Sequence, residues 1–253
     1  MKKPTDIGPN RTGIGTSPID SKRLVEASEE LTPFEGVDGE QLESERVEWA
    51  SAAEPVGTMP PPATLKGAAK TAVQLIKGNK PTIFLDKLGE RLAFERTGTR
   101  LYEALLIKLQ AGTPHAGAPT RDDLEQIRDE ELRHFAIVRS AIERLGADPT
   151  AMTPCADVNG VLAMGLVQVL SDPRTTLTQC LEAMLVAELA DNDGWTMLVD
   201  LADGLGFDDL TREFRVALQE EETHLARVRE WITTAVEGQA GIAPTPPRPE
   251  ARP

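Results

Sequence analysis

Two short motifs in this sequence have the residue types and the spacing of a metal site. Glu131-x-x-His134 and Glu221-x-x-His224 each place a carboxylate and an imidazole three positions apart. On a helix, residues three apart lie side by side on one surface. The chain has three histidines, and two of them fall in these motifs. The spacing therefore predicts two helix faces that can each offer an oxygen and a nitrogen ligand.

The apolar periodicity predicts four long helices that would carry these groups. Apolar residues recur with a period of 3.6 over residues 83–111, 120–146, 174–204 and 208–237. Each apolar stripe contains ionisable residues near its middle, which are Glu95 on the first helix, Glu188 on the third, and the two motifs on the second and fourth. The residues expected to face inward around them are Leu88, Leu92, Thr99, Tyr102, Leu106 and Leu109 on the first helix, Leu124, Ile127, Phe135, Val138 and Ile142 on the second, Leu181, Met184, Trp195 and Leu198 on the third, and Phe214, Ala217, Val228, Trp231 and Ile232 on the fourth.

The sequence also repeats itself across its two halves. Ligand candidates and neighbouring aromatic residues shift together, which scattered acidic residues would not do. The offset is 93 residues from Glu95 to Glu188 and from Tyr102 to Trp195, and it is 90 residues from Glu131 to Glu221 and from His134 to His224.

Burial of four carboxylates in one apolar interior needs compensation. Each would carry a desolvation penalty of several kcal/mol, and no lysine lies on the predicted inner stripes. Two divalent cations would balance four carboxylates and leave the imidazoles as neutral ligands. A ligand set rich in oxygen, with histidine and without thiolate, favours iron or manganese over structural zinc.

Several acidic residues close in sequence to the predicted ligands are not expected to bind metal themselves. Glu130, Glu220 and Glu222 are sequence neighbours of ligands but point about 100° or more away around the helix, so we expect them to face solvent. Asp191, one turn after Glu188, is either an acceptor for a ligand imidazole or an exposed acid.

Three aromatic residues complete the set of candidates. Tyr102 and Trp195 lie two turns beyond Glu95 and Glu188, and we favour core packing over a redox role for both. His115 lies in a Gly-Thr-Pro turn and is expected to be solvated.

The order Glu, Glu-x-x-His, Glu, Glu-x-x-His over residues 83–237 resembles the ferritin-like superfamily, in the branch of rubrerythrins, bacterioferritins and manganese catalases. The resemblance implies two iron ions, or alternatively two manganese ions. It also implies a role for each ligand: Glu95 and Glu188 terminal, Glu131 and Glu221 bridging, and His134 and His224 each bound to one metal.

The same resemblance implies a redox enzyme that reacts with O₂ or H₂O₂. No cysteine-rich electron-transfer segment is present, so a reductive reaction would need an external electron donor. The alternative is an iron-binding, ferroxidase or sequestration protein without a catalytic cycle. The long acidic N-terminal region argues against a cage-forming storage protein.

The expected architecture is all-α. A ferritin-like four-helix bundle is predicted over residues 81–238, with one long crossover at 147–173 between its second and third helices. A basic accessory helix is expected at 63–80, packed beside the bundle, with membrane-surface contact as the alternative. Residues 1–62 and 239–253, rich in Pro, Gly and polar residues, are expected to be largely disordered.

Composition limits the partners. The chain of 253 residues has a formal net charge of −14, which opposes non-specific nucleic-acid binding. No signal peptide is expected, and the apolar run Val161–Leu170 is too short to span a bilayer, so a cytoplasmic protein is predicted. Pairing of chains through helix faces and a docking role for the N-terminal Gly-Ile-Gly-Thr-Ser-Pro segment are left open.

Overall fold

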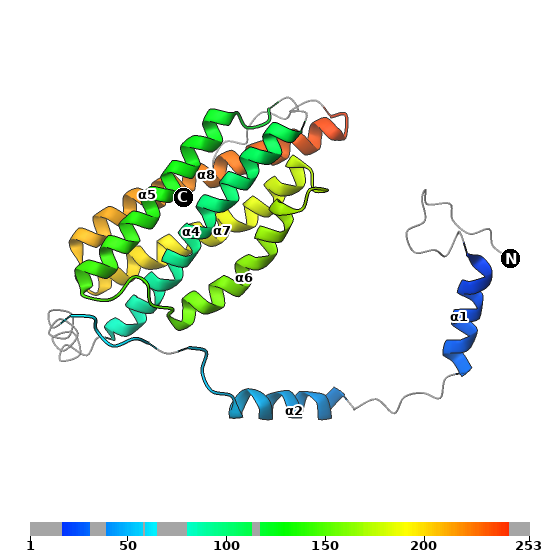
Figure 1. The fold of residues 1–253 in the computed structure, drawn as a ribbon, viewed down its shortest axis with the longest axis horizontal. Coiled ribbons are helices and arrows are strands. Elements are labelled where there is room, and N and C mark those ends of the chain that lie inside the picture. Colours follow the sequence, from blue (N-terminus) through cyan, green and yellow to red (C-terminus); the bar gives the residue numbers. More distant parts are fainter. Residues whose placement is uncertain (1–16, 31–38, 58, 65–79, 113–116, 243–253) are drawn as a thin grey trace. The chain divides into compact units, whose positions relative to one another are not determined.

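The computed structural model describes residues 17–30, 39–57, 59–64, 80–112 and 117–242, which form helices and no strand (Figure 1). The all-α prediction is therefore confirmed over this part of the chain. In chain order the helices are α1 (Pro18–Glu30), α2 (Gly39–Ala52), α4 (Pro81–Ala111), α5 (Arg121–Leu145), α6 (Pro154–Ser171), α7 (Leu177–Gly204) and α8 (Asp208–Gln239).

The chain divides into two compact units, Met1–Glu54 and Pro55–Pro253. The first contains α1 and α2, where we expected little regular structure, and the structure differs from that expectation. Helical hydrogen bonds are local and need no core, and α2 buries no residue. An ion pair one turn apart, between Lys22 and Glu26 at 3.4 Å, adds local support in α1.

The four long helices begin and end within a few residues of their predicted limits. Pro81 occupies the first turn of α4, where its missing N–H is not needed. Thr120 and Asp123 form the capping box at the start of α5 that the sequence indicates, and Thr176 caps α7 in the same way. Gly146 ends α5 with a φ of +82°, a left-handed conformation that favours glycine.

The buried residues show the direction of each long helix. The starts of α4 and α8 share one apolar cluster with the ends of α5 and α7, and the opposite ends share a second cluster. Helices α5 and α7 therefore run in the same direction, opposite to α4 and α8. A chain that leaves α5 must travel the length of these helices before α7 begins.

Helix α6 makes this crossover, where the sequence indicated only a long connection with an apolar stretch. Its start is fixed to α4 by a hydrogen bond from the Cys155 amide to the Asp86 carboxylate, at 2.8 Å. Beyond its end, Lys108 of α4 donates to the Asp172 and Thr175 carbonyls. The helix thus runs parallel to α4, and it packs against both α4 and α7.

Helix α6 is 18 residues long with a mean hydropathy of 1.2, and 22% of it is buried. Among the described residues it is the one helix long and apolar enough to cross a membrane by length and composition, a test that core helices of soluble proteins also pass. The apolar run noted in the sequence is therefore part of a longer helix.

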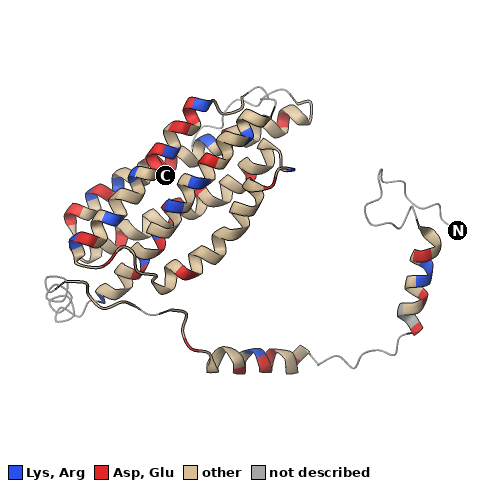
Figure 2. Ribbon diagram, viewed as in Figure 1, with Lys and Arg blue, Asp and Glu red and all other residues tan. Residues whose placement is uncertain are grey.

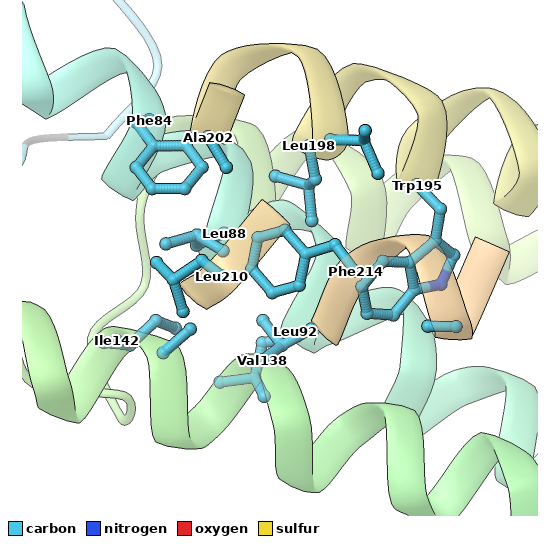
Figure 3. Packing of buried hydrophobic residues seen from close by; sticks show 13 residues of the cluster. Phe84, Leu88, Leu92, Val138, Ile142, Trp195, Leu198, Ala202, Leu210 and Phe214 are labelled. Carbon is cyan, nitrogen blue, oxygen red and sulfur yellow. The ribbon is translucent and has the colours of Figure 1, made fainter. Parts of the chain in front are cut away.

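The core consists of the two apolar clusters, and helices α4, α5, α7 and α8 contribute to both. Figure 3 shows the first cluster, in which Phe84, Phe214 and Trp195 are surrounded by leucine, valine and alanine side chains. Most of the predicted inward-facing residues are buried. Five of them are only partly buried, and these are Thr99, Leu106, Leu109, Phe135 and Ile232. The residues between the clusters form the candidate site.

Some sequence expectations fall outside the described residues. These are most of the accessory helix (65–79), the solvated His115, most of the proposed N-terminal docking segment, and residues 243–253 of the tail.

Phe214 tests the first cluster. It is fully buried and packs edge-on against Trp195, with ring centroids 5.5 Å apart. We expect Phe214→Ala to lower the free energy of unfolding by about 3–5 kcal/mol, through lost burial and the cavity left behind. Urea denaturation would measure this change. The control is Val216→Ala on the same helix, whose side chain is exposed; equal losses in the two variants would contradict the described packing.

Candidate metal centre

The six predicted ligands lie together between the two apolar clusters. On each of α4, α5, α7 and α8, the ligand position falls between a residue of one cluster and a residue of the other, as Glu95 does between Leu92 and Leu101. None of the six side chains is more than 2% exposed. The structure therefore brings together all of the residues that the sequence pattern selected.

The six residues form two overlapping groups. Within each group the ligand atoms lie within 4.8 Å of one another, a spacing that can hold a metal ion. Glu131 belongs to both groups. The first group is Glu95, Glu131, His134 and Glu221, and the second is Glu131, Glu188 and His224.

Glu221 connects the two groups. Its Oε1 lies 2.6 Å from Nδ1 of His134, and its Oε2 lies 3.2 Å from Nδ1 of His224. Nδ1 of His224 is also 3.7 Å from Oε1 of Glu131. Both histidines thus turn the same ring nitrogen toward the shared carboxylates.

Many ligand atoms have no hydrogen-bond partner within the protein. A buried acceptor without a partner costs free energy. Here the acceptors converge on one another, with Arg91 at 3.1 Å from Glu95 and the His134 ring at 2.6 Å from Glu221 as their nearby partners. These oxygen and nitrogen atoms are suited to coordinate a cation, so the six residues fit a bound metal ion. The atoms are Glu95 Oε1 and Oε2, Glu131 Oε2, Glu188 Oε2, Glu221 Oε1 and His134 Nδ1.

The far nitrogen of each histidine is held by a second carboxylate. Nε2 of His134 lies 2.8 Å from Oε2 of Glu220, and Nε2 of His224 lies 2.8 Å from Oε2 of Glu130. The expectation that these two glutamates face solvent is wrong, because each side chain reaches from its own helix across to the histidine of the neighbouring helix, between α5 and α8. With Nε2–H donating to a carboxylate, Nδ1 keeps its lone pair for a metal. Glu222 is exposed, as expected.

This outer pairing follows the internal repeat. Glu130 and Glu220 are 90 residues apart, the same offset as the motifs beside them, so each half reads Glu-Glu-x-x-His. Each half supplies the carboxylate that holds the histidine of the other half. The doubled glutamate was the sequence signal that could have identified these residues.

Arg91 is the buried cation that the sequence interpretation missed. Its guanidinium pairs with Glu95 at 3.1 Å and with Asp191 at 2.7 Å, and it is only 4% exposed. Asp191 is buried with it and contacts this arginine rather than a ligand imidazole. A Cβ at Gly194 would lie 2.2 Å from Nη1 of Arg91, so the glycine makes room for the pair. Because Arg91 balances Asp191, the charges of the four candidate ligand glutamates remain, and two divalent cations would balance them.

The two aromatic candidates differ in what they contact. The Tyr102 hydroxyl donates a 2.5 Å hydrogen bond to Oε1 of Glu188, so it orients a ligand as well as filling the core. Trp195 packs with its ring edge against His134, at 5.4 Å between centroids, and against Phe214. The packing role expected for Trp195 agrees with these contacts.

Electrostatics in the metal-free cluster favour bound protons. Burial, together with neighbouring negative charge, raises the pKa of Glu95 and of Glu188 well above the usual glutamate value. Burial opposes charging of His224, but hydrogen bonds to Glu131 and Glu221 outweigh it and raise the pKa of His224 to about 12. Burial also disfavours ionised Glu221, yet its bonds with both histidines lower its pKa to about 2.

Comparison of the chain with protein-family models, with curated proteins and with solved structures gave no match.

Gly98 offers a test that separates metal binding from folding. A Cβ at this position would lie 2.3 Å from Oε2 of Glu131. Gly98→Ala should therefore displace the shared carboxylate and weaken Mn²⁺ binding about tenfold or more, while alanine's helix propensity leaves the metal-free protein as stable or slightly more stable. Calorimetric titration and thermal unfolding measure the two effects.

The control for Gly98→Ala is Gly160→Ala in α6, where an added Cβ meets no atom within 4 Å. Unchanged Mn²⁺ affinity in Gly98→Ala would show that Glu131 does not need its observed position.

The chelator-treated protein should lose stability as the pH rises from 5 to 8. Glu95 and Glu188 have raised pKa values in the folded state, so the folded chain holds protons that the unfolded chain releases above about pH 4.5. The lowered pKa of Glu221 acts below that range, between its usual value and about 2. Thermal melts should show a falling Tm, and Glu95→Gln should flatten the slope. A Tm that rises over this range would contradict the assignment.

Proposed function

We propose that this chain is a ferritin-like dinuclear metal protein and that α4, α5, α7 and α8 are its four-helix bundle. The helix directions support this, since two hairpins joined by one long crossover are typical of that architecture. The observation that carries the proposal is the pair of overlapping ligand groups that share Glu131.

In this proposal each ligand has one role. Glu131 bridges because it belongs to both groups, and Glu221 bridges because its two oxygens face different histidines. Glu95 and Glu188 are terminal, since each belongs to one group and, unlike Glu221, neither has oxygens facing both histidines. These roles agree with those that the family resemblance implies.

The proposed ions are two iron ions, with two manganese ions as the alternative. Four carboxylates and two imidazoles without a thiolate suit both metals better than they suit structural zinc. When bound, such a pair of ions supplies Lewis acidity and a reservoir of electrons. We infer an oxidoreductase on this basis.

The surroundings of the centre limit its substrate. The ligand side chains are almost completely buried, with an apolar cluster on either side. Such a site admits small molecules more readily than large ones, which supports O₂ or H₂O₂ as the reactant, with an external electron donor in a reductive cycle.

The protein's own groups hold the centre in place. Glu130 and Glu220 fix the histidine rings, the Tyr102 hydroxyl holds the Glu188 carboxylate, and Arg91 holds Glu95. Oriented ligands in a dry interior need little rearrangement when charge changes at the centre. The Tyr102 hydroxyl, whose pKa is raised by burial and by Glu188, stays protonated as a donor.

Metal content and turnover test the proposal together. Protein purified from its native source should contain two iron or two manganese ions per chain and should consume O₂ or H₂O₂ over many turnovers. Glu131→Gln should reduce the metal content to one ion or none and abolish turnover, because the variant removes a ligand from both groups. Elemental analysis and an oxygen electrode give the two readouts.

The matched control is Glu222→Gln, an exposed glutamate next to Glu221, which should keep two ions and full activity. Two ions per chain with a single stoichiometric oxidation would instead support the sequestration alternative. Full metal content in Glu131→Gln would contradict the shared-ligand arrangement.

A further inference from the structure

A large groove lies between α4, α6 and α7, apart from the metal centre. Its volume is about 1010 Å³, at the upper end of the ~300–1,000 Å³ usual for small-molecule sites. None of the six metal ligands lines it; Arg91 borders it and also contacts Glu95. A site of this size needs a physical explanation of its own.

The walls of the groove are mainly apolar, although they are open to solvent. Helix α6 has a single charged residue and appears tan along almost its whole length in Figure 2. Leu162 of α6 is 72% exposed, and Val186 and Met197 of α7 are 57% and 47% exposed. Large aliphatic side chains that gather around a hollow favour an apolar occupant.

Both ends of the groove have polar residues, with Thr175 and Gln179 near Val169, but the unpartnered acceptor lies at the Asn159 end. Asn159 is nine-tenths buried and lines the groove, and its Oδ1 has no hydrogen-bond partner. Lys87 and Arg91 lie on the α4 side of the groove, both already paired with carboxylates. The free acceptor at Asn159 therefore calls for a donor from the occupant rather than for another anion.

The far end shows how long the occupant can be. The groove follows α6 from Asn159 to Val169, which is about 15 Å at 1.5 Å per residue. An elongated chain with a polar group at one end matches both the apolar length and the single unpartnered acceptor.

We propose that this groove binds an aliphatic molecule with a hydrogen-bond-donating head, such as a long-chain alcohol or amide, with the head at Asn159 and the chain between α6 and α7. The site does not depend on a metal, so it can be tested on chelator-treated protein and its failure is separate from failure of the proposed redox function.

The first test uses two glycines of α6. A Cβ at Gly165 or at Gly160 meets no atom within 4 Å, but only Gly165 lines the groove. N-phenyl-1-naphthylamine, a neutral apolar probe with an N–H donor, should fluoresce on binding the full chain. Gly165→Phe should weaken its binding by about tenfold or more, since a phenyl ring takes the space of several buried methylene groups. Gly160→Phe should bind it as the natural chain does.

The second test examines the head group. 1-Decanol should displace the probe at about fivefold lower concentration than decyl methyl ether, the ratio expected for one neutral hydrogen bond. In Asn159→Leu the two competitors should become equal.

Equal probe binding by both phenylalanine variants and the natural chain would overturn the proposal. The proposal would also be overturned if a second copy of the chain or a membrane covers the groove. A monomer produced from a dimer by Gly165→Phe in size-exclusion chromatography would assign this face to a second copy. Binding to phosphatidylcholine vesicles without binding of the free probe would assign it to a membrane.

Discussion

The cost of burying negative charge governs this structure. Four glutamates and Asp191 lie among apolar side chains where an unpaired carboxylate is strongly disfavoured. Arg91 offsets the charge of Asp191. The histidines contact Glu95, Glu131 and Glu221, and the Tyr102 hydroxyl donates to Glu188. Several inward-facing carboxylate oxygens still have no hydrogen-bond donor. A pair of bound cations is the simplest way to balance their charge. In the metal-free chain, bound protons take that role.

This constraint also explains why the chain uses a repeated plan. Two helical hairpins that each bring a glutamate and a Glu-Glu-x-x-His segment make a centre with near-equivalent halves, and each half holds the other half's histidine through Glu130 or Glu220. In this arrangement α5 and α7 run in the same direction. Helix α6 provides the required connection, and it forms one wall of the apolar groove as a consequence.

The four long helices, their limits and their inward faces could be predicted because apolar periodicity is strong and each stripe is interrupted at one place, as at Glu95. The ligands followed from the same pattern. Glu130 and Glu220 were assigned to solvent because helix angles alone do not show which direction a neighbouring helix occupies. Arg91 precedes Glu95 by four residues on one face, so its position was visible, but its partner Asp191 lies 100 residues away. Helix α6 was predicted only as a long connection, because Gly160 and Gly165 interrupt its apolar periodicity.

Anomalous diffraction from crystals grown with Mn²⁺ tests the central claim most directly, because it locates ions without reference to activity. The account predicts two manganese peaks inside the bundle, one beside His134 and Glu95 and one beside His224 and Glu188, with the Glu131 carboxylate between them. Crystals that diffract well and contain manganese only at the protein surface, with the glutamates turned toward protein donors, would contradict it.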